Sequence, residues 1–465
     1  MYFTLIPKKV RKIKTKYRTI NTKIPVPESI EILENLSKYE PVSMSGQPPI
    51  IWDHCDGVNV FDKYGNKWLD FSSGVLVANC GYNRKHLKDS IIREVEKGLL
   101  HTYCFPNEPR ANLVKKLSEF APDGLDKVFL LTTGSEATEN SIKLMRNYGQ
   151  KQGGVNKIGI ISFDGAFHGR TLGAQMIGGS PSLKKWIVNL DKDMHQVPFP
   201  NCFRCPCNKD NYNNCEEDCF NLFVNILKEK LGGSKFKEKI AGVITETYQG
   251  GSAAFAQKEF IKRLKAWCEK NDILLTFDEV QAGFGRCGKK WGFEHYEVIP
   301  DIICCGKGIS SSLPLSAVIT RKEIIDLFGH AEMTSTHSGN PVCCAAALAN
   351  LQLIEDENLI QNAAEVGEFL ENELVEIRNL YKDVIGTVLG KGLVYGLHIC
   401  KKDSKDPDNK TATKIVEKII QKGIMLFAPV GPGLATIKIN PPLIITKEAI
   451  MDGIEGIKEA IFEVV

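Results

Sequence analysis

From about residue 110 onward, short apolar segments alternate with amphipathic helical segments. One such helix, 257–270, repeats its apolar side chains at the spacing of a single helix face. The apolar segments lack the alternation of a strand with one wet face, so we expect strands that are buried on both sides. The sequence therefore predicts an α/β fold, in which helices cover both faces of a mostly parallel sheet. The expected strands are 128–131, 157–163, 240–246, 273–278, 301–305 and 315–319.

A smaller α+β domain is expected from the two ends of the chain. Helical patterns and short strands replace the alternating pattern after about residue 342, and segment 52–71 resembles a hairpin with a turn at Gly65-Asn66. We expect a basic N-terminal arm, two parts of a small domain, and a large cofactor-binding domain with a Cys-rich insertion at 201–220. Their ranges are 1–45 for the arm, 46–85 and 346–465 for the small domain, and 86–345 for the large domain.

The charge and the cysteine content limit the classes of binding partner and the cellular compartment that we expect. The 465 residues hold 59 Lys and Arg against 56 Asp and Glu, a net charge of +3 that argues against nucleic acid as the main partner. No run of 18 apolar residues occurs, so we expect no membrane span. Fifteen cysteines without a signal peptide indicate reduced thiols and a cytoplasmic location. The basic residues before Glu28 favour a solvated arm, with a transit peptide as the alternative.

Chemically useful groups follow the expected strands, at the end of a parallel sheet where ligands bind. The turn from Thr132 consists of small residues and leads into a helix, and the backbone N–H groups of such a turn bind anions. Asp278 ends one strand, Lys307 lies between two glycines after another, and Phe167 follows a third. A lysine, a carboxylate, a phosphate-binding turn and an aromatic ring are the parts of a pyridoxal phosphate (PLP) site. There the lysine forms a Schiff base and the carboxylate keeps the ring nitrogen protonated.

The order of these motifs resembles the class III (omega-amino-acid) aminotransferases, which are fold-type I PLP enzymes, over roughly residues 50–460. The similar stretches are TTGSEATENSIKL from Thr132, GAFHGRT from Gly165, TETYQGG from Thr245, LLTFDEVQAGFGRCGK from Leu274, PDIICCGKGI from Pro300, THSGNP from Thr336 and INPPLIIT from Ile439.

The resemblance implies a role for each matching residue. Lys307 would carry the Schiff base and move a proton, and Asp278 would pair with the ring nitrogen. Phe167 and Val280 would pack on the two ring faces, and Gln281 would lie near the phenolic oxygen. The other implied cofactor residues are Gly134, Ser135, His168 and Glu246, with Thr336 supplied by the neighbouring subunit of a homodimer.

The implied activity is the transfer of an amino group from an amino acid donor, with an omega-amino acid expected, to a 2-oxo acid by a ping-pong mechanism. The same family fold hosts amino-acid racemases, so a racemase or epimerase is the alternative. A PLP-binding regulator without activity ranks last, because Lys307 and Asp278 are both present.

The substrate site departs from that of many 2-oxoglutarate-using relatives. They have an arginine where this chain has Lys438, and that arginine pairs with the residue that matches Glu246. Lysine lacks the planar fork for a carboxylate, so we expect one weakened carboxylate site and one intact site at Arg170. The alternative is that Lys438 pairs with Glu246 and specificity is unchanged. Val75 replaces the tyrosine of ornithine-type relatives, which disfavours ornithine as the donor.

Five cysteines fall within 18 residues of the insertion. The C-x-x-C and C-x3-C spacings predict a structural zinc site, and a loop of buried thiols or a labile disulfide is the alternative. The expected ligands are Cys202, Cys205, Cys215 and Cys219.

Overall fold

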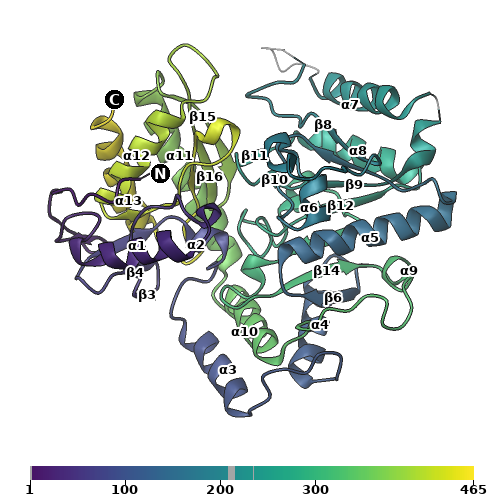
Figure 1. Cartoon of the computed structure of the whole chain (residues 1–465), viewed down its shortest axis with the longest axis horizontal. Coiled ribbons are helices and arrows are strands. Elements are labelled where there is room, and N and C mark those ends of the chain that lie inside the picture. The colour runs from purple at the N-terminus through teal and green to yellow at the C-terminus, as the bar shows by residue number, and fades with distance from the viewer. Residues whose placement is uncertain (1–2, 208–214, 234) are drawn as a thin grey trace. The chain divides into compact units, whose positions relative to one another are not determined.

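The computed structural model describes residues 3–207, 215–233 and 235–465 (Figure 1). The chain folds into two compact units, of which unit 1 is Met1–Lys85 with Asn358–Val465 and unit 2 is His86–Glu357. Unit 2 runs past the expected boundary at residue 345, because α10 (Pro341–Asp356) is one continuous helix that packs against α4 (Glu108–Phe120). The four-part division expected from the sequence stays a prediction.

The basic N-terminal segment packs into unit 1. Strand β1 (Ile13–Lys14) pairs with β2 (Thr19–Ile20), and Thr19 pairs with Lys67. Ile20, Ile24 and Arg18 are buried, and Arg18 forms an ion pair at 2.8 Å with Asp452, which is partly buried. The expectation of a solvated arm is therefore wrong for this stretch, because its apolar side chains enter the core between the charged ones.

The hairpin predicted for segment 52–71 is confirmed. Strands β3 (His54–Asp56), β4 (Asn59–Phe61) and β5 (Lys67–Asp70) are antiparallel neighbours. The turn forms because Asp62 Oδ1 accepts the backbone N–H groups of Tyr64 and Asn66, each at 2.9 Å. The other elements of unit 1 are α1 (Ile30–Tyr39), α2 (Ser73–Leu76), α11 (Leu359–Leu380), β15 (Ile385–Lys391), β16 (Val394–Ile399), α12 (Asn409–Gln421), β17 (Ile424–Met425), β18 (Thr436–Ile439) and α13 (Lys447–Phe462).

Unit 2 is built on a seven-stranded sheet with the order β6-β14-β13-β12-β9-β7-β8. β14 pairs antiparallel with both of its neighbours, β6 and β13, and the other pairs of this sheet are parallel, so the predicted, mostly parallel α/β sheet is confirmed. The strands are β6 (Lys127–Leu131), β7 (Gly159–Phe163), β8 (Met194–Val197), β9 (Ile240–Glu246), β12 (Leu274–Asp278), β13 (Ile302–Cys305) and β14 (Ser316–Thr320).

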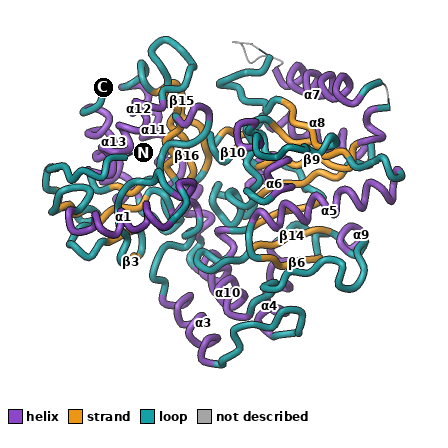
Figure 2. Tube along the Cα trace, in the orientation of Figure 1, coloured by secondary structure: helices purple, strands orange, loops and turns teal. Residues whose placement is uncertain are grey.

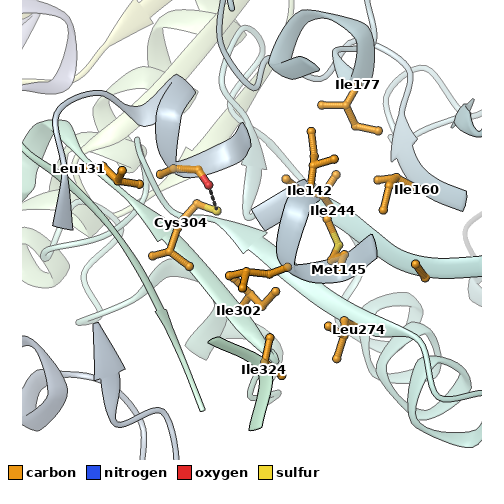
Figure 3. Close-up of a cluster of buried hydrophobic side chains, with 14 residues drawn as sticks. Leu131, Ile142, Met145, Ile160, Ile177, Ile244, Leu274, Ile302, Cys304 and Ile324 are labelled. Atoms are coloured by element: carbon orange, nitrogen blue, oxygen red, sulfur yellow. Dashed lines mark hydrogen bonds between the residues drawn. The ribbon is translucent and has the colours of Figure 1, made fainter. Parts of the chain in front are cut away.

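Every residue of the central strands β9 and β12 is buried. Alternate side chains of a strand point to opposite faces, so both faces of the sheet are covered. Helix α5 (Gly134–Gly153) covers one face with Ile142 and Met145, which belong to the same buried cluster as Ile244 and Ile302 of the sheet (Figure 3). Figure 2 colours the strands of this sheet orange and the helices purple. The other helices of unit 2 are α3 (Lys85–Glu96), α6 (Leu172–Ile177), α7 (Cys215–Leu231), α8 (Lys258–Lys270) and α9 (Lys322–Ile325). Strands β10 (Tyr248–Gln249) and β11 (Ala254–Phe255) form a separate two-stranded sheet. No helix in the described ranges is long and apolar enough to cross a membrane.

Candidate active site

The carboxyl ends of the parallel strands gather the predicted residues around one cavity of about 120 Å³ in unit 2. Asp278 ends β12 beside Glu246, which ends β9, because the two strands are in register. Lys307 lies two residues after the end of β13. The lining residues are Gly134, Ser135, Phe167, His168, Gly169, Glu246, Tyr248, Asp278, Val280, Gln281, Ala282 and Lys307.

Asp278 is held by two hydrogen bonds at the end of β12. Its Oδ2 lies 2.8 Å from Nδ1 of His168, and its Oδ1 accepts the backbone N–H of Val280 at 3.1 Å. Both side chains of the Asp278–His168 pair are buried. Burial disfavours the charged imidazole, but the hydrogen bond and charge of Asp278 outweigh it and raise the pKa of His168. The buried Asp278 therefore favours the charged form of the His168 imidazole.

Glu246 is the second buried carboxylate of the cavity. Its two oxygens accept backbone N–H groups, from Phe167 at 3.0 Å and from Gly250 at 2.8 Å. Burial raises its pKa to about 7, and the charge of Asp278 adds to this while that of His168 opposes it. Glu246 therefore changes its protonation near neutral pH.

Lys307 has two marks of a functional lysine. Burial lowers the pKa of its ammonium group, and the charges of Asp278 and Glu246 oppose this only in part. Its backbone φ of 46° lies in the left-handed region, which non-glycine residues rarely adopt outside turns and functional sites.

The N-terminus of α5 forms one wall of the cavity. Thr133 and Glu136 form a capping box at the start of this helix. Gly134 and Ser135 lie between them, as the first two residues of the first turn. A Cβ on Gly134 would meet a methyl group of Val280 at 2.8 Å, so glycine is needed for the helix to approach this closely. The helix end presents N–H groups and the positive end of its dipole, which is the arrangement that binds phosphate.

The residues of the cavity fit PLP. It needs an anion site, a carboxylate for the ring nitrogen, and a lysine, and these stand at α5, Asp278 and Lys307. Two buried polar atoms that line the cavity, Nε2 of His168 and Oε1 of Gln281, have no hydrogen-bond partner among the described residues. A polar ligand would supply such partners.

Four predicted residues lie outside the cavity lining. Thr336 is exposed in unit 2, and Arg170 is exposed with its guanidinium 5.3 Å from the ring centre of Phe167. Val75 is exposed and Lys438 is buried, and both belong to unit 1.

The predicted zinc site is not supported. Sγ of Cys219 lies 3.8 Å from Sγ of both Cys207 and Cys215, whereas Cys202 accepts a hydrogen bond from Gln257 at 3.2 Å. Within ranges 3–207, 215–233 and 235–465, no group of three or more His, Cys, Asp or Glu side chains could hold a metal ion.

Tyr248 is a cavity residue that the sequence reasoning missed. It is buried, and burial raises the pKa of its hydroxyl well above the usual range. Its position two residues after Glu246 could have indicated this, because in an extended chain the side chains of residues i and i+2 point to the same face.

The titration of Glu246 predicts a pH dependence of stability. Its pKa is about 7 in the folded chain against an ordinary 4.5, so the folded state binds more protons between these values. The free energy of unfolding should therefore fall as pH rises from 4.5 to 7, by roughly 2–3 kcal/mol for this group. Glu246→Gln should flatten that part of the decline, as measured by urea unfolding of the cofactor-free protein across this range. Glu279, whose pKa is also about 7, keeps its own contribution in both proteins. An unchanged decline in the variant would contradict the assignment.

Comparison with known proteins identifies the family of this chain. A lysine, a buried carboxylate and a helix N-terminus at the carboxyl edge of a mixed sheet define a fold-type I PLP enzyme. The chain belongs to the class-III aminotransferases, whose family model matches residues 42–461.

Individual relatives span two activities. The chain is 32% identical to a leucine/methionine racemase of Thermococcus litoralis, over 93% of this chain and 96% of that protein. It is 31% identical to the 4-aminobutyrate aminotransferase of Escherichia coli, over 93% of this chain and 98% of that protein. A Bacillus anthracis aminotransferase structure is similar with a TM-score of 0.83 and 30% identity, over 94% of this chain and 99% of that one.

Proposed function

We propose that this class-III aminotransferase moves an amino group from an amino acid, with an omega-amino donor favoured, to a 2-oxo acid. The observation that carries the proposal is the single cavity that joins Lys307, the Asp278–His168 pair and the N-terminus of α5. When bound, PLP supplies an electron sink for the charge that develops at the substrate carbon. The residues of the chain hold the cofactor and move the proton.

Each side chain has a defined task in this proposal. Lys307 would bind the cofactor covalently and would then move a proton at the substrate carbon, for which its lowered pKa suits it. Asp278 would accept the hydrogen bond of the ring nitrogen. Phe167 and Val280 would cover the two ring faces, and Gln281 would bind near the phenolic oxygen. Gly134 and Ser135 would donate N–H groups to the phosphate, with Thr336 of a second subunit.

The proposal includes a homodimer. In unit 2, apolar side chains that follow one another along α3 and the next loop are exposed, which is typical of a surface that a second copy covers. They are Ile92, Val95, Leu99, Leu100 and Phe105. Thr336 is exposed as well, so it is accessible to another subunit. A cytoplasmic location is proposed on the fifteen cysteines, all of which are described and free of disulfides.

The first test is a screen of amino donors on the purified protein loaded with PLP. A donor should bleach the visible absorbance of the bound cofactor, and a 2-oxo acid should restore it. If no donor among omega- and alpha-amino acids changes the absorbance, the proposed function fails.

A racemase is the second candidate, and a specific observation favours it. Racemisation needs acid/base groups on both faces of the substrate carbon, and Glu246 titrates near neutral pH in the same cavity as Lys307. Two of the relatives also carry racemase names. Incubation of one enantiomer without any oxo acid separates the candidates. A racemase continues to turn over, whereas an aminotransferase stops after one half-reaction.

His168 should matter through Asp278. His168→Ala removes a hydrogen bond to a charged group, which is worth about 1.5–3 kcal/mol, so kcat should fall by about 10–100-fold. PLP should still bind, because the variant keeps Lys307 and the helix N-terminus. Steady-state kinetics with cofactor-saturated protein measures the effect. A kcat within about twofold of wild type would contradict the role of this pair.

Lys438 should decide the preferred oxo acid. We expect the enzyme to use 2-oxoglutarate less efficiently than pyruvate, because a lysine gives no bidentate carboxylate contact. Lys438→Arg should then raise kcat/KM for 2-oxoglutarate by up to about 1–3 kcal/mol of transition-state binding, with pyruvate unchanged. A wild type that strongly prefers 2-oxoglutarate, together with an arginine variant that gains nothing, would sink the hypothesis.

A further inference from the structure

Glu279 is a buried carboxylate of unit 2 that lies beside the cavity without lining it. It comes directly after Asp278, the last residue of β12, and the two residues that follow it are Val280 and Gln281. All three of these neighbours line the cavity. A buried carboxylate is costly unless hydrogen bonds satisfy it, so the partners of Glu279 indicate what it does.

The carboxylate of Glu279 accepts hydrogen bonds from two other segments of unit 2. Its Oε1 accepts the hydroxyl of Thr247 and, at 3.1 Å, the backbone N–H of Phe293. Its Oε2 accepts the backbone N–H of Gly292 at 2.7 Å. Gly292 and Phe293 begin a short 3₁₀ helix, and the first N–H groups of a helix have no partner within it. Glu279 therefore caps this helix and binds Thr247 with the same side chain.

Thr247 is held in place at both of its polar groups. Its hydroxyl donates to the capping carboxylate, and its backbone carbonyl accepts the hydroxyl of Tyr296, from the same 3₁₀ helix, at 2.5 Å. A Cβ on Gly292 would meet Cγ2 of Thr247 at 2.7 Å, so the helix packs directly against this residue. The residues on either side of Thr247 are Glu246 and Tyr248, and both line the cavity. A shift of Thr247 would therefore move two cavity residues.

Glu279 ties the end of β12 to both neighbouring strands. On the side of β13, its backbone N–H donates to the carbonyl of Cys304 at 2.7 Å. On the side of β9, Asp278 is opposite Glu246 in the parallel pairing. The residues that follow this pair are Glu279 and Thr247, and the bond between their side chains extends the pairing beyond the last backbone pair. This bond lies directly behind the two carboxylates of the cavity.

We propose that Glu279 is a positioning residue, whose carboxylate fixes the ends of β9 and β12 so that Asp278 keeps its contact with His168. The effect of Glu279 on turnover rests on the proposed function. Its effect on the contact between Asp278 and His168 does not, and it can be measured without any substrate.

The test uses Thr247→Val and Glu279→Gln, with Asp301→Asn as the matched control. Thr247→Val removes the hydroxyl but keeps the shape of the side chain and leaves the charge of Glu279 in place. Glu279→Gln also keeps the shape, but the amide nitrogen cannot accept a hydrogen bond. Asp301 is another buried carboxylate of the same sheet, and its Oδ2 accepts the backbone N–H of Leu275 at 2.8 Å. It lies outside the cavity lining.

The first readout is an NMR titration of the full chain with labelled histidine. The hydrogen bond and charge of Asp278 raise the pKa of His168, with a contribution from the charge of Glu246. A displaced Asp278 stabilises the charged imidazole less, so we expect the pKa of His168 to fall by about 0.5–1 in both variants. It should stay within about 0.2 of wild type in Asp301→Asn. Because Thr247→Val changes no charge, a fall in that variant reports the position of Asp278.

The second readout is the steady-state kinetics of the PLP-loaded enzyme with the best donor of the wild type. We expect kcat to fall about tenfold in both variants, while KM stays within about twofold. An unchanged pKa of His168 in Thr247→Val overturns the positioning role, whatever the activity. An equal fall of this pKa in Asp301→Asn overturns it as well, because general destabilisation would then explain the effect.

The remaining outcomes separate this inference from the proposed function. A lowered pKa of His168 with kcat within about twofold of wild type overturns the effect on turnover. If no donor reacts with the wild type, the proposed function has failed, and the titration still decides the role of Glu279. Should Glu279→Gln fail to fold, Thr247→Val carries both readouts.

Discussion

Replacement of Lys307 by alanine is expected to abolish turnover, with kcat lowered by at least about 10⁴-fold, the upper end of what general acid–base catalysis contributes. The variant loses the covalent attachment of the cofactor and the group that moves the proton, and no other lysine lines the cavity among the described residues. The visible absorbance that depends on the lysine–cofactor bond should disappear as well.

Lys157→Ala is the matched control for this prediction. Lys157 is another buried lysine of unit 2 whose pKa is lowered by burial, and its Nζ donates to the carbonyl of Asn271 at 3.1 Å. It lies outside the cavity lining, so its replacement should lower stability without removing the absorbance. Normal turnover by Lys307→Ala would overturn the assignment of the site.

The sequence predicted the sheet of unit 2 well where its strands are buried. The expected strand 240–246 is the observed β9, and 273–278 differs from β12 by one residue. The direction of β14 could not be predicted, because an apolar run looks the same in either direction. β8 (Met194–Val197) was missed, since this edge strand is only partly buried and contains His195 and Gln196.

The sequence was sufficient to predict which site residues lie at the ends of the strands, but not the contacts that the loops make. Asp278 and Lys307 could be placed in one cavity, because the carboxyl ends of parallel strands meet at one edge. The contact between His168 and Asp278 was not foreseen, since it depends on the path of the loop after β7. The hydrogen bond from Nδ2 of Asn440 to the carbonyl oxygen of Ser72 joins residues that are 368 positions apart in the sequence. Local sequence patterns carry no information on such a pairing.

Asp278→Asn is expected to lower kcat by about 10²–10³-fold, the scale of losing one preorganised electrostatic contact at the reacting group. The carboxylate of Asp278 favours a protonated ring nitrogen, which strengthens the electron withdrawal by the cofactor. An amide of the same shape can still accept a hydrogen bond, but it carries no negative charge. The ring nitrogen is therefore expected to lose its proton in the variant.

A second effect of Asp278→Asn involves His168. Since the hydrogen bond and charge of Asp278 raise the pKa of His168 against the effect of burial, the variant should lower that pKa and leave the imidazole neutral. A pH titration of the protein by NMR, with labelled histidine, measures this change independently of activity.

The control for Asp278→Asn is Asp301→Asn. Asp301 is equally buried and lies just before β13, at the opposite end of the sheet, where its Oδ2 accepts the backbone N–H of Leu275 at 2.8 Å and its Oδ1 pairs with Arg321 at 2.7 Å. Its replacement removes a charge from the same sheet without touching the cavity, so stability should fall while kcat of the folded enzyme stays within about twofold. If Asp278→Asn likewise retained kcat within about tenfold, with the pKa of His168 unchanged, the carboxylate would have a structural role, and its assignment to the ring nitrogen would be wrong.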